Sequence, residues 1–268
     1  MKLELKGKRA LVTGSTSGIG KTIAKTLAEE GVYVVVHGRN RSKALSVVDD
    51  ITKAGGKAAI AIGDLATDEG AAEVGCQAVN AYDGIDILVN NAGGFPNESW
   101  FKTSADVWVD VYNQNVGSMV RMIQHLVPNM KEQGWGRIIA ISSLVSAMPL
   151  AEQASYSASK SANVNLAVSL AKELAGTGIT SNAISPGPIL TEGFKEFALK
   201  RAKQEGWIEE DITAVEHKWA TEVVRNPTGR MGRPEDIANA VAFLASPKAS
   251  FINGTNLRVD GGTVPTVN

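Results

Sequence analysis

A glycine-rich turn between an apolar run and a helical stretch constrains the fold of this chain more than any other feature. Arg9–Thr13 reads as a buried strand and Lys21–Glu30 as a helix. A strand, a tight turn and a helix N-terminus in succession present backbone N–H groups to a phosphate. The sequence therefore predicts a dinucleotide site, with the G-x3-G-x-G spacing in place of the commoner G-x-G-x-x-G. The turn comprises Gly14, Ser15, Thr16, Ser17, Gly18, Ile19 and Gly20.

Strands and helices continue to alternate along the chain. This pattern predicts an α/β fold, a single doubly wound Rossmann-type parallel sheet of about seven strands in one domain, residues 1–268. A charged helical stretch at about 190–228 interrupts the alternation. It is interpreted as a substrate lid or as an insertion serving oligomer contacts. The further expected strands are Val32–His37, Lys57–Ile62, Ile85–Asn90, Gly136–Ser143, Gly178–Ser185 and a last one from Asn256.

Composition narrows the class of protein. Apolar residues make up 44% of the chain, charged residues 21%, and the formal net charge is −1. This is a globular composition without the charge that would hold a nucleic acid or a membrane surface. The lone Cys76 excludes an internal disulfide and a cysteine metal site, and His37, His125 and His217 lack metal-ligand spacing and read as surface or capping residues. With neither a signal peptide nor a membrane span in the pattern, we expect a soluble, cytoplasmic protein without a metal.

The end of the second strand bears on cofactor choice. NAD-preferring sites hold the ribose 2′-hydroxyl with an acid about 20 residues past the turn, and the residues from His37 to Arg41 include no carboxylate. Arg39 could instead pair with a 2′-phosphate, which favours NADP(H) and leaves NAD possible. The alternative is that Arg39 and Arg41 only begin the next helix in solvent. After the third strand, Asp64 either accepts from the adenine amino group or caps the helix that starts near Thr67.

Tyr156 and Lys160 are the candidate acid/base pair. Four residues apart on a helix, they share one face, and a nearby ammonium lowers the pKa of a phenol. The pair could act as a general acid/base, although this spacing also arises by chance. Ser143, at the end of the fifth strand, reaches the same sheet edge. Asn115 lies inside a long helical stretch, where it sits on a polar face or holds a water or a side chain.

Taken together and in this order, these motifs resemble the short-chain dehydrogenase/reductase family over roughly Lys6 to Gly262. The resemblance implies that Tyr156 is the acid/base, that Lys160 lowers its pKa and binds the nicotinamide ribose, that Ser143 binds the substrate oxygen, and that Asn115 holds a water leading to Lys160. It also implies cofactor contacts for Asp64 and Leu65 at the adenine, for Asn91, Ala92 and Gly93 at the adenosine ribose, and for Pro186, Gly187, Ile189 and Thr191 at the carboxamide.

The resemblance implies an NADP(H)-dependent oxidoreductase that interconverts a carbonyl and a secondary alcohol by hydride transfer. Its activity would be like that of a 3-oxoacyl-thioester, ketone or sugar reductase. The alternatives are an NAD-dependent alcohol dehydrogenase and a non-catalytic nucleotide-binding sensor or scaffold. Ser17 stands where NADP-binding relatives often carry a basic residue, and the long lid leaves the substrate open. The family usually forms homotetramers through the Asn115 and Tyr156 helices and the last strand. An apolar pocket wall is expected from Trp100, Phe101, Leu144, Met148, Leu150 and Phe194, with core or subunit contacts as the equal alternative.

Overall fold

The computed structural model describes residues 1–96, 100–207 and 211–266. Within them, seven strands form one sheet in the order β3-β2-β1-β4-β5-β6-β7, and all neighbouring strands run parallel. This confirms the predicted fold class, whereas the single-domain assignment stays a prediction. The strands are β1 (Arg9–Val12), β2 (Tyr33–Gly38), β3 (Lys57–Ile62), β4 (Ile87–Asn90), β5 (Gly136–Ile141), β6 (Ile179–Pro186) and β7 (Asn256–Val259).

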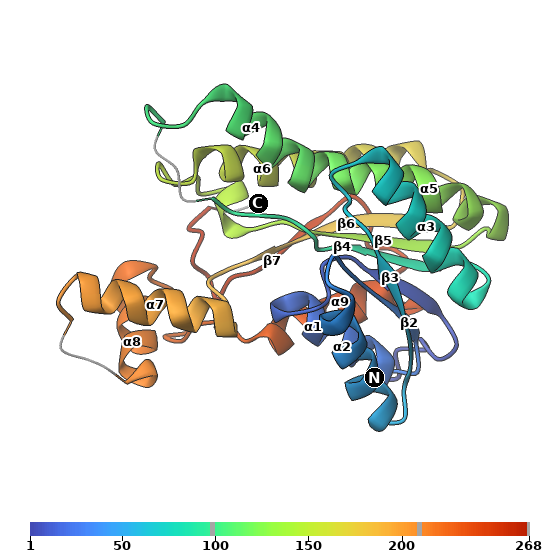
Figure 1. Cartoon of the computed structure of the whole chain (residues 1–268), viewed down its shortest axis with the longest axis horizontal. Coiled ribbons are helices and arrows are strands. Elements are labelled where there is room, and N and C mark those ends of the chain that lie inside the picture. The colour runs from blue at the N-terminus through green and yellow to red at the C-terminus, as the bar shows by residue number, and fades with distance from the viewer. Residues whose placement is uncertain (97–99, 208–210, 267–268) are drawn as a thin grey trace.

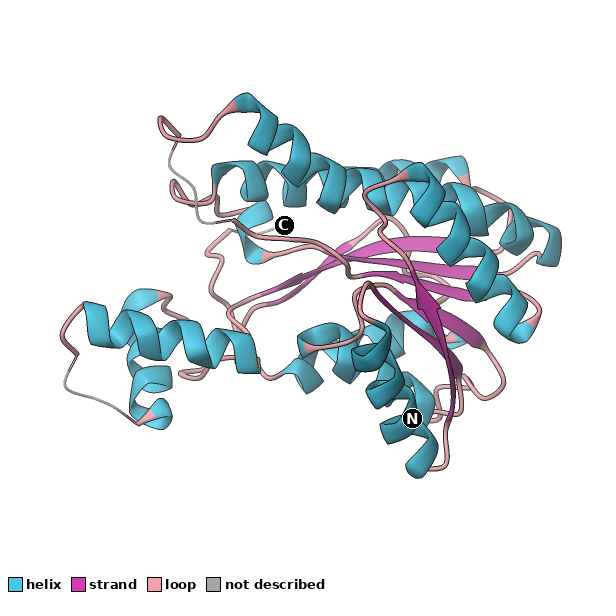
Figure 2. Cartoon of the chain, viewed as in Figure 1, coloured by secondary structure: helices cyan, strands magenta, loops and turns pink. Residues whose placement is uncertain are grey.

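Helices cover both faces of the sheet (Figures 1 and 2). Side chains alternate between the two faces of a strand, so Val12 and Val89 pack in one core while Leu11 and Leu88 pack in the other. Because both faces are buried, the strands read as continuous apolar runs. One face carries α1 (Gly18–Glu29), α2 (Arg41–Lys53) and α9 (Pro234–Ala245); the other carries α3 (Asp68–Tyr82), α4 (Ala105–Tyr112), α5 (Ser118–Gln133) and α6 (Ala154–Glu173).

The order of the strands selects one edge of the sheet for ligands. The chain reverses direction across the sheet at β1, which lies between β2 and β4, and ligands bind beyond the carboxyl ends of strands at such a switch point. A π-helical turn, Asn113–Gly117, joins α4 to α5 near this edge. Such turns often mark functional sites because they redirect side chains within a helix.

The segment after β6 is a small helical unit with its own core. It contains α7 (Glu192–Gln204), α8 (Ile212–Lys218) and the π-helical turn Trp219–Val223, and it projects beyond the strand ends (Figure 1). Trp219, only 4% exposed, is packed edge-on by Phe194. A bridge between Ile189 and Gly232 joins the unit's two connections to the body. We refer to residues 190–228 as the lid segment. None of the helices described is long and apolar enough to cross a membrane.

Candidate active site

The glycine-rich turn is built by close backbone approaches that a side chain would block. Gly14 has φ 63°, and a Cβ added there would lie 2.9 Å from Ala92 Cα. A Cβ at Gly20 would lie 2.5 Å from the side-chain amide nitrogen of Asn91. Gly18 has φ 53°, and a Cβ added there would lie 3.6 Å from the Thr191 methyl. The turn, the Asn91–Gly93 loop and the start of the lid segment therefore meet, as a cofactor spanning them requires.

Thr13, just before the turn, holds the next loop in place. Its hydroxyl oxygen accepts from the backbone N–H groups of Asn91 at 2.9 Å and Ala92 at 3.0 Å. The Asn91 side chain donates in return to the carbonyls of Thr13 at 2.9 Å and Gly14 at 3.1 Å. The sequence analysis placed Thr13 at the end of the strand before the turn and assigned it no role in the site. The sequence feature that could have predicted this role is a hydroxyl side chain at the carboxyl end of a strand, directly before the glycine-rich turn.

The adenosine side of the predicted site brings Arg39 and Asp64 together. Their side chains are 79% and 50% exposed and approach to 3.8 Å. Thr67, not Asp64, caps α3 by accepting from the Gly70 N–H, while Asp64 accepts from the Ala66 N–H. The capping alternative for Asp64 is therefore wrong. Leu65 is buried beside this pair.

Asn115 lies in the π-helical turn with its side chain fully engaged. Its amide oxygen accepts from Gly94 N–H at 2.8 Å, and its nitrogen donates to the Gly94 carbonyl at 3.0 Å and to the Ser159 hydroxyl at 2.9 Å. A Cβ on Gly93 would lie 2.6 Å from the Asn115 amide oxygen and 3.7 Å from Lys160 Nζ. Asn115 thus ties the Gly93 loop to α6, and its role in holding a water stays a prediction.

Ser143, Tyr156 and Lys160 come together at the carboxyl edge of β5. Tyr156 and Lys160 share one face of α6, with Lys160 Nζ 5.6 Å from the centre of the Tyr156 ring. The hydroxyls of Ser143 and Tyr156 are hydrogen-bonded. The buried Lys160 ammonium donates to the Ile141 carbonyl at 2.8 Å. Three polar groups on rigid elements therefore converge where a substrate oxygen would need a proton donor.

Burial sets the directions of the pKa shifts of Tyr156 and Lys160, and the expectation that Lys160 lowers the pKa of Tyr156 stays a prediction. Burial raises the pKa of Tyr156 to about 12, and the Ser143 hydrogen bond offsets part of that rise. Burial also lowers the pKa of Lys160 to about 8. The ammonium bonds to a carbonyl rather than to the phenol, so desolvation decides both directions. Tyr156 is therefore a protonated donor at neutral pH.

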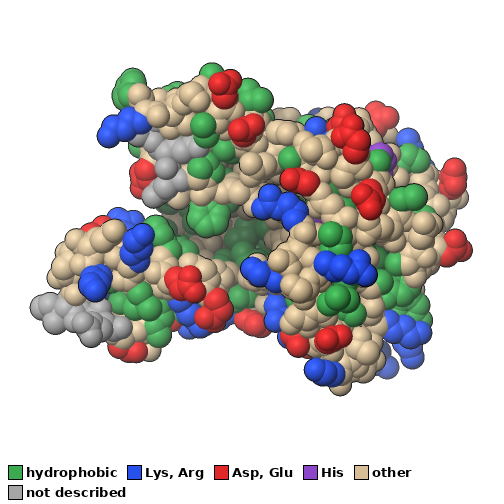
Figure 3. All heavy atoms as spheres, viewed as in Figure 1, with side chains coloured by type: hydrophobic (Ala, Val, Ile, Leu, Met, Phe, Trp, Pro, Cys, Tyr) green, Lys and Arg blue, Asp and Glu red, His purple; other side chains and the backbone are tan. Residues whose placement is uncertain are grey.

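The surroundings of Tyr156 are apolar. Leu144 and Val145 pack with Val264, and Met148, Leu150 and Tyr156 lie against this cluster. The Phe95 ring, which the sequence analysis missed, lies 6.1 Å from the Tyr156 ring. A hollow opens between the lid segment and the part of the molecule that carries α4 and α6, and hydrophobic side chains lie at its bottom (Figures 1 and 3).

The remaining predicted wall residues lie elsewhere. Trp100 packs on Trp108 at 5.0 Å between ring centres, Phe101 is fully exposed, and Phe194 belongs to the lid core. Only Leu144, Met148 and Leu150 of the expected wall lie beside Tyr156.

The predicted carboxamide segment links β6 to the lid segment. Pro186 ends β6, and Gly187 lies so close to Asp260 that an added Cβ would be 2.7 Å from its Cα. Ile189 is buried in the main core. Thr191 caps α7 by accepting from the Phe194 N–H at 3.2 Å.

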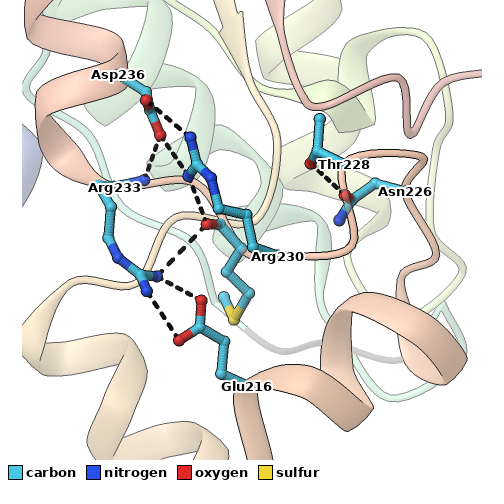
Figure 4. Close-up of polar contacts among 7 residues, drawn as sticks. Glu216, Asn226, Thr228, Arg230, Arg233 and Asp236 are labelled. Atoms are coloured by element: carbon cyan, nitrogen blue, oxygen red, sulfur yellow. Dashed lines mark hydrogen bonds and ion pairs between the residues drawn. The ribbon is translucent and has the colours of Figure 1, made fainter. Parts of the chain in front are cut away.

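One ion pair fastens the lid segment to the N-terminus of α9, and a second joins Arg230, just beyond the lid segment, to α9 itself (Figure 4). Arg233 binds Glu216 of α8 with both guanidinium nitrogens, one of them at 3.0 Å from Oε2. Arg230 binds Asp236 at 2.8 and 3.1 Å. Two-pronged pairs of this kind specify orientation as well as attraction. The Glu216–Arg233 pair therefore orients α8 relative to the start of α9.

A cavity of about 440 Å³ lies at the carboxyl ends of β6 and β7, beside the start of α9. Its lining includes Gly187, Ile189, Arg230, Asp236 and Asp260, and none of Ser143, Tyr156 or Lys160. The hydrogen-bonded cluster at β5 and α6, and not this cavity, marks the candidate active site. No metal-binding group of three or more His, Cys, Asp or Glu side chains occurs among the residues described.

The prediction that all three histidines are surface or capping residues is wrong for His37, which is 3% exposed on β2. Gly14 N–H donates to its Nδ1 at 3.0 Å, and its Nε2 contacts the Gly63 carbonyl at 3.2 Å. The sequence feature that could have predicted this burial is the position of a single His at the end of an apolar strand.

Comparison with known proteins adds independent information. The family model described as "Enoyl-(Acyl carrier protein) reductase" matches residues 14–264. The uncharacterized oxidoreductase YvaG of Bacillus subtilis is 41% identical, with 100% of both chains covered. The 3-oxoacyl-[acyl-carrier-protein] reductase FabG of Aquifex aeolicus is 36% identical over 98% of this chain and 99% of its own. L-sorbose reductase from Gluconobacter frateurii, solved with NADPH and L-sorbose, superposes with a TM-score of 0.94 at 32% identity, covering 100% of both chains.

Proposed function

The chain belongs to the short-chain dehydrogenase/reductase family, and we propose that it reduces a ketone to a secondary alcohol with NADPH, using Tyr156 as the proton donor. The observation that carries this proposal is the half-buried Tyr156 hydroxyl, protonated at neutral pH and hydrogen-bonded to Ser143. A nucleotide-binding scaffold would have no use for such a donor beside a dinucleotide site.

The residues present fit a nicotinamide dinucleotide. Glycines let the loops around the expected cofactor site pack closely on one another: Gly14 against Ala92, Gly20 against Asn91 and Gly93 against Asn115. Backbone N–H groups at the start of α1 suit the diphosphate, and the edge formed by Gly18 and Thr191 leads to the nicotinamide side. When bound, the cofactor supplies or accepts the hydride.

The chain's own groups handle the proton. Tyr156 donates its proton to the carbonyl oxygen in reduction and takes it back in oxidation. Ser143 offers a second hydrogen bond to the oxygen on which charge develops. Lys160, buried beneath Tyr156, supplies a positive charge on this side of the site below its pKa of about 8. The apolar Leu144, Val145 and Val264 cluster excludes water from one side of Tyr156.

The case for NADP(H) rests on the end of β2. Arg39 is largely free in solvent, 3.8 Å from Asp64, and its guanidinium matches a 2′-phosphate. The preceding Gly38 faces Thr16 so closely that an added Cβ would lie 2.5 Å from the Thr16 methyl. A carboxylate for a ribose 2′-hydroxyl therefore has little room there. NAD(H) remains the alternative cofactor.

The test is oxidation of NADPH and of NADH by the purified protein against a carbonyl panel. Keto-sugars and 3-oxoacyl thioesters come first, because relatives of both kinds cover the whole chain; steroids and aromatic ketones follow. We expect turnover with NADPH that Tyr156→Phe abolishes. Tight NADPH binding without turnover in either direction on the whole panel would contradict the proposal and favour a nucleotide-binding scaffold.

We also propose that the chain forms a homotetramer. An apolar groove runs along α4 and the π-helical turn that follows it, with Trp108, Val109, Tyr112 and Val116 in its lining. It supports a second copy as its occupant, and Val109 is 65% exposed there. This stretch is part of the helical region through which the family resemblance implies that subunits pair. Light scattering should give about four times 28.2 kDa, and Val109→Glu should lower that mass; a monomeric wild type would contradict the proposal.

A further inference from the structure

His37 lies beneath the junction of the two loops assigned to the cofactor's adenosine diphosphate. Its ring is buried between the glycine-rich turn and the end of β3. On one side Gly14 N–H donates to Nδ1 at 3.0 Å, and on the other Nε2 contacts the Gly63 carbonyl at 3.2 Å. One side chain thus spans the turn that begins at Gly14 and the loop that continues into Asp64 and Leu65.

The two partners decide the state of the ring. A backbone N–H can only donate, so Nδ1 must carry no proton; a carbonyl can only accept, so Nε2 must carry one. His37 is therefore a neutral imidazole in the Nε2–H form. Burial lowers the pKa of His37 to about 4, with the Gly63 carbonyl and Asp64 opposing that shift and Arg39 adding to it. Protonation would turn a donor at Nδ1 toward the Gly14 N–H, and the contact would be lost.

The backbone of the same residue strengthens the link. The Ser15 N–H donates to the His37 carbonyl at 2.9 Å, and the His37 N–H donates to the Ser15 hydroxyl at 3.0 Å. The Ser15 hydroxyl donates onward to the Val12 carbonyl at 2.7 Å. Main chain and side chain of His37 therefore hold two successive residues of the turn, and the ring alone reaches across to Gly63.

We infer that His37 is a positioning residue that sets the glycine-rich turn and the adenosine-side loop at the separation a dinucleotide needs. This inference rests on the proposed cofactor site. His37 touches neither the reacting atoms nor Tyr156, so its loss should weaken cofactor binding and spare turnover once the cofactor is saturating. Both loops serve the adenosine diphosphate that NADPH and NADH share. The loss should therefore be the same fold for both cofactors, unlike a change at Arg39.

The experiment compares three variants with the wild type. His37→Leu fills the space without polar atoms, His37→Asn restores an acceptor for Gly14 N–H, and His37→Gln reaches toward Gly63. His125→Asn, on the exposed surface of α5, is the matched control. Dissociation constants for NADPH and NADH are measured at equilibrium, alongside the cofactor KM and kcat. We expect His37→Leu to raise both dissociation constants about tenfold, because a buried donor loses its acceptor, with kcat within about twofold.

Several results would overturn the inference. Equal affinity in His37→Leu and wild type would remove the positioning role, and so would a kcat that falls as far as the affinity. A second measurement needs no variant: ¹⁵N NMR of the wild type should show Nε2 protonated and Nδ1 unprotonated from pH 7.5 to 5.5. A ring that titrates near its ordinary pKa would contradict the geometry. If the wild type binds neither nucleotide, the proposed function fails and the inference fails with it.

Discussion

Replacing Tyr156 with Phe removes one hydroxyl from the centre of the candidate site. The ring keeps its contacts with Phe95 and with the Leu144 cluster. Ser143 keeps a backbone partner, because its hydroxyl oxygen also accepts from the Val145 N–H at 3.4 Å. The fold should therefore change little, and a shift in Tm above about 4 °C is not expected.

The effect on chemistry should be large. A positioned general acid contributes about 10²- to 10⁴-fold, which corresponds to about 2.7–5.5 kcal/mol of barrier. With Tyr156 protonated at neutral pH, its proton is available at every pH up to the range of its pKa of about 12. We expect kcat to fall by about that factor at saturating NADPH while the NADPH dissociation constant stays within about twofold.

The assay is single-turnover oxidation of bound NADPH, followed optically, on the best ketone of the panel. Tyr82→Phe is the matched control, since burial also raises the pKa of Tyr82, which lies on α3 away from the site. A Tyr156→Phe variant that keeps kcat within tenfold of wild type would refute Tyr156 as the proton donor. Loss of NADPH affinity in that variant would show instead that the Tyr156 hydroxyl helps to position the cofactor.

Three further predictions follow from the geometry. Arg39→Asp should move cofactor preference toward NADH by about tenfold or more, measured as the ratio of kcat/KM values with Arg41→Asp as control; an unchanged ratio would reject Arg39 as the 2′-phosphate ligand. Burial lowers the pKa of Lys160 to about 8 from its ordinary 10.5, so between these values the unfolded state binds more protons and stability rises with pH. Urea unfolding at pH 7.5 and 9.5 should show this rise in unfolding free energy in wild type and not in Lys160→Met. An equal change in unfolding free energy in the two proteins would contradict the burial argument. Glu216→Gln breaks the ion pair with the partly exposed Arg233 and should cost about 1 kcal/mol, or about 2 °C in Tm. Substrate KM should also rise without a change in NADPH affinity; Glu222→Gln is the control, and an unaltered KM would argue against the lid segment shaping the substrate site.

Local sequence already determined much of this protein. The succession of strand, glycine-rich turn and helix at residues 9–30 specifies the phosphate-binding geometry through nearest-neighbour backbone preferences. The four-residue spacing of Tyr156 and Lys160 places both on one helix face. The alternation of apolar runs and amphipathic helices specifies a parallel sheet, because only short runs buried on both faces need such continuous apolarity.

Tertiary structure decided what depends on residues far apart in the chain. Whether His37 lies in solvent or beneath the turn depends on Gly14 and Gly63, 23 and 26 positions away. The direction of the Tyr156 pKa shift depends on how far distant segments, including Val264, bury the site, because desolvation there is the largest cause of the rise. The orientation of the lid segment depends on the ion pair between Arg233 and Glu216. Periodicity reports which face of an element is buried, whereas burial depth and hydrogen-bond partners exist only once the elements have packed.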